Sequence, residues 1–372
     1  MHQYKFSLVV AATLAAFALA GCGSGSSAGS QAPKIQFTSQ VTFGDSLSDV
    51  GSYEVGFIAA AYGGRFTVNT FLPSGAHAPT NYTELLAAQL GLPAPCAAQT
   101  GLQFSSSSPE YPLSVPVVQN AGCTGYAQGG SRVTGFPGIG NQYAEANGFA
   151  LTLPVQQQIA LHLQTHGGKF SGTEDVLVLA GANDIFFNFG LIAASAETPT
   201  QALTAVVQAA TDLVGYVNNQ IIANGANYVV VMNVPDISTT PFGFGAEAQA
   251  AGSQALLKGM VQAYNSTLQA GLTSSKVLYV DLFTVSDQQI SNPSIFGLTN
   301  VSTPACNLNY PNNILATQGS ADSGSSLVCN TSNLIPGDVS NYEFADTVHP
   351  TPYGNILLAR YVATQMVTKG WL

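Results

Sequence analysis

Charged residues are scarce in this sequence. Only 8% of its 372 residues are charged, and the nine Lys and Arg leave a formal net charge of −10. Basic residues that are so few and so scattered form no footprint for a nucleic acid, and the anionic balance argues against electrostatic docking on acidic lipid surfaces. The sequence also lacks a Cys-x-x-Cys pair. These absences exclude nucleic-acid binding and cysteine-based metal or redox chemistry of that type.

The apolar run near the N-terminus is too short to cross a bilayer. Residues 7–20 form this run after Lys5, and about 14 residues fall short of the roughly 20 that a membrane-spanning helix needs. Such a run is typical of a signal peptide. It ends at Leu19-Ala20-Gly21-Cys22, which resembles the lipobox of bacterial lipoproteins. The resemblance implies cleavage before Cys22 and lipid on its thiol. An ordinary signal peptide followed by a chance cysteine is the alternative.

The sequence indicates three segments. We expect a lipoprotein signal peptide over residues 1–21, a lipidated Gly/Ser-rich tether over 22–35 and a single domain with loop insertions over 36–372. A Gly/Ser-rich tether is flexible and has no core to bury. Gly23 stands where an aspartate would retain many lipoproteins at the inner membrane. The expected location is therefore the outer membrane, on its periplasmic or its cell-surface face.

Four cysteines remain once Cys22 is assigned to the lipid. An even number in an oxidising compartment indicates disulfides, and three pairings are possible. We favour the local pairing, Cys96–Cys123 with Cys306–Cys329, because it closes two loops of moderate size in Pro- and Ser-rich segments. Four free thiols are the alternative.

Apolar runs alternate with helical patterns from residue 36 onward, without a linker-like break or an internal repeat. This alternation predicts a parallel sheet flanked by helices. The expected strands are 36–43, 175–180, 228–232 and 277–280, and residues 117–127 are expected to form a short strand and a turn. The expected helices are 79–90, 153–163, 200–224, 249–272 and 351–366. Two further segments, 94–116 and 291–340, are expected to be loops.

Polar residues come shortly after four of the expected strands. They are Ser46, Asn183, Asp236 and Asp281. The carboxyl ends of the strands in an open parallel sheet are where ligands bind. We therefore expect a site at that edge of the sheet, with Asp236 and Asp281 in structural roles.

Four short blocks carry the chemistry. In chain order they are Gly44-Asp45-Ser46-Leu47, Gly125-Tyr126-Ala127-Gln128-Gly129-Gly130, Gly181-Ala182-Asn183-Asp184 and Asp346-Thr347-Val348-His349-Pro350. In this order they resemble the GDSL, or SGNH, family of serine esterases and lipases, from about residue 38 to residue 372. The second block departs from the family pattern, which often has Asn where this chain has Gly125. The resemblance implies a three-layer α/β/α fold with a flavodoxin-like parallel sheet of about five strands, and no metal or other cofactor.

The resemblance also implies a role for each residue. Ser46 would be the nucleophile, His349 the general base, and Asp346 the group that orients the imidazole. The backbone N–H groups of Ser46 and Gly130 and the side-chain amide of Asn183 would form the oxyanion hole. Glycine at position 130 is interpreted as removing a Cβ that would keep the backbone away from the substrate oxygen.

Other polar residues receive structural interpretations. Asp45, Asp49 and Asp184 are expected to shape turns and cap helices. His77 lacks a neighbouring aspartate and is a weaker candidate for the base. His162 and His166 have a metal-capable i, i+4 spacing, but their segment is interpreted as a solvated helix face.

The expected reaction is hydrolysis of carboxylic acyl esters through an acyl-serine intermediate. The expected partners are a small-molecule or lipid ester, with phospholipids among the candidates, and the membrane through the lipid anchor. A carbohydrate O-deacetylase or an acyltransferase on the same fold is the runner-up. A catalytically silent surface-binding lipoprotein is the alternative without enzymatic activity. The sequence leaves acyl chain length and oligomeric state open.

Overall fold

The computed structural model describes residues 34–308 and 325–372. The chain divides into two units, Met1–Pro33 and Lys34–Leu372, and all of the described residues belong to the second. The expected signal peptide, the lipidation site Cys22 and nearly all of the tether lie outside the described residues.

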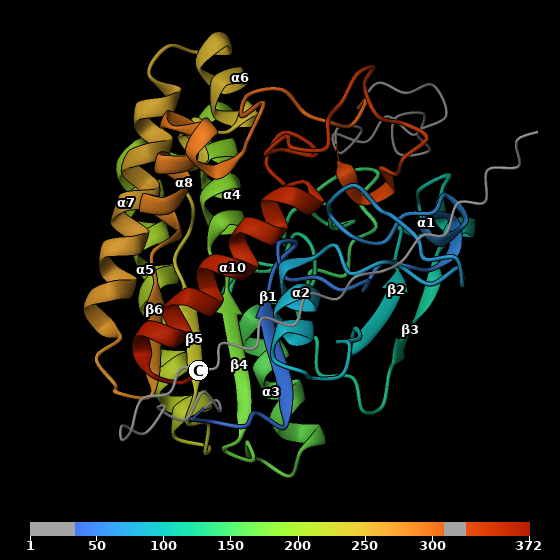
Figure 1. Cartoon of the computed structure of the whole chain (residues 1–372). Helices are drawn as coiled ribbons and strands as arrows, with labels where there is room; N and C mark the ends of the chain where they lie inside the picture. The colour runs from blue at the N-terminus through green and yellow to red at the C-terminus, as the bar shows by residue number, and fades with distance from the viewer. Residues whose placement is uncertain (1–33, 309–324) are drawn as a thin grey trace, which may run out of the picture. The chain divides into compact units, whose positions relative to one another are not determined.

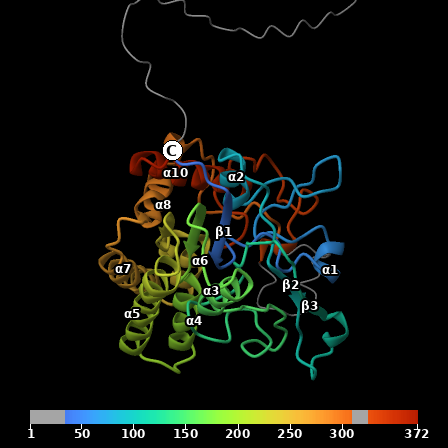
Figure 2. The same cartoon turned by 90° about the horizontal axis from the view of Figure 1, so that it is seen from below.

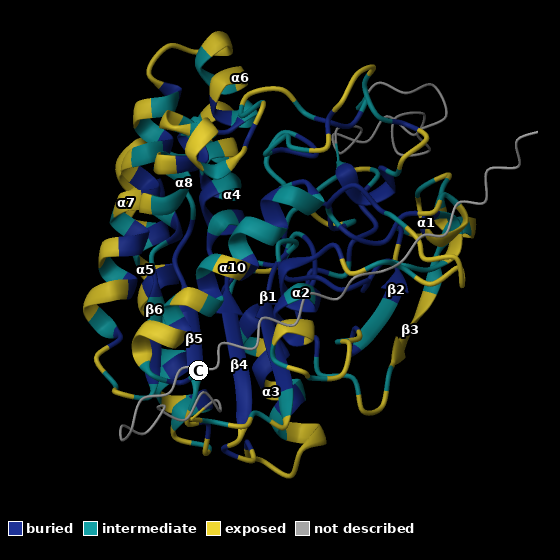
Figure 3. Ribbon diagram, in the orientation of Figure 1, coloured by how far each residue is buried: buried dark blue, intermediate teal, exposed yellow. Residues whose placement is uncertain are grey.

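A parallel sheet of four strands forms the centre of the described unit. Its strand order is β1-β4-β5-β6, and each neighbouring pair is parallel. The strands are β1 (Ser39–Gly44), β4 (Glu174–Leu179), β5 (Val229–Met232) and β6 (Val277–Val280). Nearly every residue in them is buried (Figure 3). This burial follows from the Val- and Leu-rich composition, because helices cover both faces of such a sheet.

The expected short strand and turn over 117–127 is present, although its strand lies outside the central sheet. Its first residues belong to β3 (Val115–Gln119), which pairs antiparallel with β2 (Gln99–Leu102) in a separate sheet, where a loop was expected. Only residues 124–126 lie beside β1, held by hydrogen bonds from Thr42 N–H to the Thr124 carbonyl and from Tyr126 N–H to the Thr42 carbonyl. With this short segment counted, the strand order is the flavodoxin-like 2-1-3-4-5.

Helices cover the sheet in two layers (Figures 1 and 2). One face carries α3 (Val155–Thr165), α5 (Pro199–Tyr216) and α7 (Ser253–Gly271). The other carries α2 (Tyr82–Gln89) and α10 (Pro352–Lys369). Each layer has its own apolar core, because alternate strand residues point to opposite faces. Phe43 and Val178 face the α3 side, whereas Leu177 and Leu179 face the α10 side.

The remaining elements are short or lie beyond the carboxyl edge of the sheet. The α-helices are α1 (Gly56–Ala60), α4 (Ala182–Ala193), α6 (Pro241–Gln249) and α8 (Leu282–Ser291). A π-helical segment, Val217–Ile222, continues α5. The 3-10 helices are η1 (Tyr111–Leu113), η3 (Ile237–Thr239), η4 (Pro293–Phe296) and η6 (Ser326–Val328). The sequence did not predict α4, α6 or α8.

Both expected disulfides are present. Cys96–Cys123 has its Cα atoms 5.1 Å apart, and Cys306–Cys329 has them 6.1 Å apart. Both distances are ordinary for disulfides. Cys96–Cys123 joins the segments that lead into β2 and into residues 124–126, whereas Cys306–Cys329 holds η6 within the expected loop 291–340.

Candidate active site

Ser46 lies just beyond the carboxyl end of β1. Gly44 ends the strand with a φ of +153°, and a Cβ there would lie 2.1 Å from the Leu179 carbonyl oxygen of β4. Only glycine fits this conformation and this close approach. The side chain of Gln158, from α3, accepts a hydrogen bond from Gly44 N–H and donates one to the Gly44 carbonyl, both at 2.8 Å. The backbone that presents Ser46 is therefore fixed from two sides.

Two buried aspartates hold the turn around Ser46. Asp45 accepts a hydrogen bond from Leu47 N–H at 3.1 Å, and burial raises the pKa of Asp45 to about 7. Asp49 Oδ1 accepts from Gly51 N–H at 2.9 Å, and its Oδ2 accepts from Gly129 N–H at 2.9 Å. Asp49 thus connects the turn that contains Ser46 to the Gly129–Gly130 loop. This arrangement fits the turn-shaping roles expected for these residues.

His349 and Asp346 share one turn immediately before α10. Asp346 Oδ2 lies 2.7 Å from His349 Nδ1, while Asp346 Oδ1 accepts from His349 N–H at 2.7 Å and from Val348 N–H at 2.9 Å. The carboxylate therefore fixes both the backbone and the ring of His349. His349 Nε2 lies 2.7 Å from Ser46 Oγ. With Nδ1–H donated to the carboxylate, the Nε2 lone pair faces the Ser46 hydroxyl.

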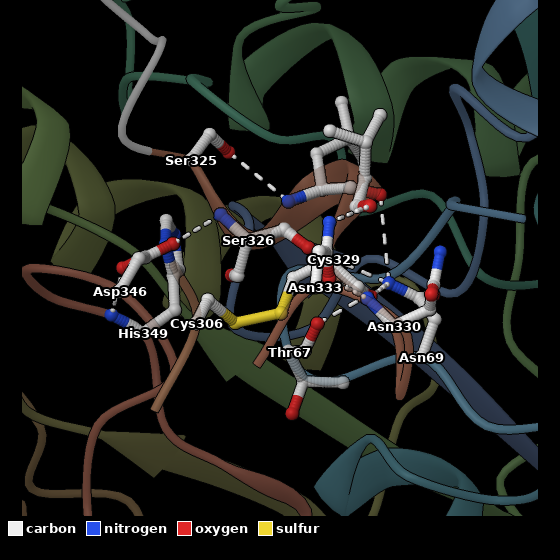
Figure 4. The surroundings of a disulfide bond; sticks show 12 residues. Thr67, Asn69, Cys306, Ser325, Ser326, Cys329, Asn330, Asn333, Asp346 and His349 are labelled. Carbon is white, nitrogen blue, oxygen red and sulfur yellow. Dashed lines mark hydrogen bonds and ion pairs between the residues drawn. A yellow bond between two sulfur atoms is a disulfide. The ribbon is translucent and has the colours of Figure 1, made fainter. Parts of the chain in front are cut away.

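Asp346 is held as an anion by its surroundings. Its burial, at 1% exposed, would raise its pKa, but the charge of His349 and the hydrogen bonds that Asp346 accepts lower the pKa below its ordinary value. One of these hydrogen bonds comes from Ser326 N–H, at the start of η6, 2.6 Å from Oδ2. Figure 4 shows this contact beside the Cys306–Cys329 disulfide. Cys306 N–H in turn donates to the carbonyl of Ala345, the neighbour of Asp346.

The three groups expected to form an oxyanion hole line the same cavity as Ser46 and His349. Asn183 lies in the first turn of α4, and its amide donates to the Ser131 carbonyl at 2.9 Å, which fixes the side chain. In the described part of the chain, the Ser46 and Gly130 N–H groups donate to no other protein group. N–H donors beside a serine–imidazole pair can stabilise the negative charge that develops in acyl transfer.

Packing within the protein also requires glycine at position 130. Gly130 has a φ of +80°, and a Cβ there would lie 2.0 Å from the Ile139 carbonyl oxygen. Glycine at this position was expected to let a substrate oxygen approach the backbone. The contact with Ile139 explains the glycine without a substrate, because any side chain at position 130 would push its loop away from the loop that contains Ile139.

The cavity beside Ser46 has a volume of about 650 Å³. Its wall is mainly apolar and includes Phe66, Phe149, Phe186, Phe189, Phe242 and Leu327. The Phe66 ring lies 5.0 Å from the His349 ring. Among the described residues that line the cavity, none is Lys or Arg, so an anionic group would meet no positive side chain there. The cavity therefore suits a neutral ligand with an apolar portion.

Three contributors to the site were missed by sequence reasoning. Gln158 lies at i+3 from Val155, on the face of the helix that was expected to be apolar. A polar residue on an apolar face is the sequence signal that could have identified it. Phe66 and Ser326 carry no such signal, because Phe66 lies in a loop and Ser326 begins a short 3-10 helix in a segment without a periodic pattern.

The other histidines within the described residues, His77, His162 and His166, lie outside the cavity lining. His77 pairs with Glu54 at 3.0 Å, so it does have a carboxylate partner, although not an aspartate. His162 is 1% exposed and stacks on Phe170, and burial lowers its pKa to about 4. The expectation of a solvated helix face is therefore wrong for His162, whereas His166 is exposed. Among the described residues, no cluster of His, Cys, Asp or Glu could hold a metal ion.

The remaining aspartates stabilise local structure. Asp236 caps η3 through Ser238 N–H at 2.9 Å and pairs with Lys258 at 2.7 Å. Asp281 caps α8 through Thr284 N–H at 3.1 Å. Asp184 accepts from Val133 N–H at 2.9 Å. None of these carboxylates lines the cavity around Ser46.

Two comparisons with known proteins bear on this site. The model of the GDSL-like lipase/acylhydrolase family matches residues 41–362. A GDSL esterase/lipase of Arabidopsis thaliana is 26% identical over 250 residues, which cover 63% of this chain and 64% of that protein. The match thus spans less than two thirds of the length of this relative.

Proposed function

The chain belongs to the GDSL-like lipase/acylhydrolase family, and on this basis we propose that it hydrolyses carboxylic acyl esters through an acyl-serine intermediate. The observation that carries the proposal is the hydrogen-bonded chain Asp346–His349–Ser46 at the wall of an apolar cavity. The proposed roles are nucleophile for Ser46, general base and acid for His349, and orienting carboxylate for Asp346.

The reaction follows from this geometry. Ser46 Oγ attacks the ester carbonyl carbon while its proton passes to His349 Nε2, and the carbonyl oxygen becomes an oxyanion. The N–H groups of Ser46 and Gly130 and the Asn183 amide stabilise this charge, each donor contributing about 2.7–4 kcal/mol. The C–O bond to the alcohol then breaks, and the departing oxygen takes the proton from His349. Water repeats the sequence on the acyl-serine, releasing the acid and restoring Ser46.

The cavity favours esters with a substantial acyl portion. An acetyl group on a carbohydrate would leave most of the apolar wall unused, which argues against the O-deacetylase alternative. Transfer of the acyl group to another alcohol uses the same intermediate and differs only in the acceptor. A phospholipid could be a substrate if its phosphate remained outside, since the described lining offers no Lys or Arg.

The test uses nitrophenyl esters of graded acyl length with the wild type and Ser46→Ala. We expect Ser46→Ala to lose at least ~10³-fold in kcat. Ser48→Ala is the matched control, because the Ser48 hydroxyl lies two residues away and bonds to Tyr82 at 2.8 Å. Equal turnover by Ser46→Ala and the wild type would rule out the nucleophile. No turnover by a folded wild type at any acyl length would favour the surface-binding lipoprotein.

We also propose that the protein is exported and anchored in the outer membrane through lipid on Cys22. The lipobox-like sequence supports this location, as do two disulfides of a kind that persists in oxidising compartments. No helix within residues 34–308 and 325–372 is long and apolar enough to cross a membrane. Intact mass spectrometry should find lipid on Cys22 and no residues 1–21. An unmodified Cys22 would contradict the anchor.

A further inference from the structure

We propose that α4 forms the acyl-chain subsite and that Gly190 sets the length of acyl chain that it accepts, an inference that rests on the proposed ester hydrolysis. One face of α4 lines the cavity. It carries Asn183, Phe186, Gly190 and Ala193 at helical i, i+3 and i+4 spacings. This face leads from the oxyanion donor Asn183 toward the exposed end of the helix.

The wall that continues from Asn183 is apolar. Phe186 and Phe189 pack against Phe242 of α6, with ring centroids 5.0 and 6.1 Å apart. These aromatic rings lie on α4 and α6, two elements anchored at the carboxyl edge of the sheet. An aliphatic chain that lies along them would bury its methylene groups without leaving any polar group unpaired.

The mechanism assigns this wall to the acyl side of the ester. The carbonyl oxygen must point toward Asn183 and the two N–H donors, whereas the departing alcohol oxygen must lie beside His349, which returns a proton to it. Phe66 packs against the His349 ring at 5.0 Å and so lies on the alcohol side. The acyl chain is therefore directed away from Phe66 and along α4.

Gly190 leaves this subsite open at its outer end. A Cβ built at Gly190 would meet no atom within 4 Å, whereas at Gly129 and Gly130 it would lie 2.2 and 2.0 Å from a neighbouring atom. Packing therefore does not require glycine at 190. Gly190 lies seven residues beyond Asn183, about 10 Å along the helix axis. In an extended acyl chain, the zigzag makes each C–C bond of about 1.5 Å advance the chain by somewhat less than the bond length. Roughly eight carbons are therefore needed to extend from Asn183 to Gly190.

The experiment compares Gly190→Leu and Gly190→Ala with Gly259→Leu. Gly259 is a matched control, because it is an exposed helical glycine of α7, its Cβ would also meet nothing within 4 Å, and it does not line the cavity. Leucine and alanine have higher helix propensity than glycine, so α4 should be retained. Two ester panels are used: one varies the acyl chain from butanoyl to hexadecanoyl, and the other varies the alcohol at a fixed acyl chain.

We expect Gly190→Leu to keep kcat/KM for the butanoyl ester within about twofold and to lose at least ~10-fold for the dodecanoyl ester. Gly190→Ala should show a smaller loss in the same direction, and Gly259→Leu should keep the wild-type profile. An unchanged acyl profile in Gly190→Leu, or an equal loss at every acyl length, overturns the subsite. A changed preference in the alcohol panel instead overturns the orientation. If the folded wild type hydrolyses no ester, the proposed function itself fails, which is a distinct result.

Discussion

Removing the Cys306–Cys329 disulfide should reduce activity far more than removing the Cys96–Cys123 disulfide. The two removals should nevertheless lower the free energy of unfolding by similar amounts. The two disulfides span 23 and 27 residues in sequence. In the chain-entropy model, cross-links over such lengths each stabilise the fold by about 3.5 kcal/mol. Paired Cys→Ser variants of the two disulfides are therefore matched in stability.

Their difference lies in what each disulfide supports. On one side of the disulfide, Cys306 N–H donates a hydrogen bond to the carbonyl of Ala345. On the other side, Ser326 lies three residues before Cys329, and its N–H donates to Asp346 Oδ2 at 2.6 Å. The disulfide thus connects the segment that donates to the Asp346 carboxylate (Figure 4) with a segment that bonds to the backbone of the preceding residue, Ala345. A hydrogen bond to a charged group contributes about 1.5–3 kcal/mol. Its loss from the Asp346–imidazolium pair in the transition state corresponds to roughly 10- to 150-fold in kcat.

The assay measures denaturant unfolding, kcat, KM and the pH profile of kcat for both variants. Without the Ser326 hydrogen bond, the pKa of Asp346 should rise toward its ordinary value. The Cys306/Cys329 variant should therefore have a lower kcat across the pH profile, whereas the Cys96/Cys123 variant should keep the wild-type kcat. The reasoning is refuted if both variants lose kcat equally, or if neither loses it.

Three further predictions follow from single residues. Asp346→Asn should lower kcat by about 10⁴-fold while KM changes little, as steady-state kinetics on a nitrophenyl ester would reveal. Gly44→Ala should cost at least about 2 kcal/mol in urea unfolding, because its Cβ would lie 2.1 Å from a carbonyl oxygen. Burial raises the pKa of Asp175 from 3.8 to about 7, so the stability linked to its protonation is present below pH 3.8 and lost as the pH rises through 7. Between pH 4 and pH 8 the free energy of unfolding of the wild type should therefore fall by up to about 4 kcal/mol more than that of Asp175→Asn, which urea titrations at the two pH values would measure.

The elements that sequence predicted well are those with a strong local pattern. The run Val277–Val280 was expected as a strand and is β6, because a strand buried on both faces is a short, continuous apolar run. Helix α4 was missed for the opposite reason. Its Ile and Phe residues lie on several sides of the helix, while Asn183, Asp184 and Asn188 are buried. The buried face of α4 is therefore not a purely apolar stripe, which is the pattern that indicates a helix in a sequence.

For the site too, sequence predicts the residues that stand in local motifs and misses the contacts between distant segments. Ser46, Asn183, Asp346 and His349 stand in recognisable blocks, so sequence could name them before their geometry was known. The contact of Ser326 with Asp346 and the aromatic wall of the cavity arise from packing between distant segments. Local propensity and spacing carry no information about such contacts. The sequence likewise did not indicate the pairing partner of residues 115–119, which is β2.

The separation of the two halves of the site along the chain has a consequence for biosynthesis. Ser46 Oγ and His349 Nε2 meet across 303 residues of sequence. At ribosomal rates of about 5–20 residues per second, the proposed nucleophile is made roughly 15–60 s before the proposed base. Under the proposed mechanism, the nascent chain carries an unactivated serine until His349 has been synthesised and has folded against it. Ester hydrolysis would then begin only after folding, and partly made chains would leave the esters of the producing cell intact.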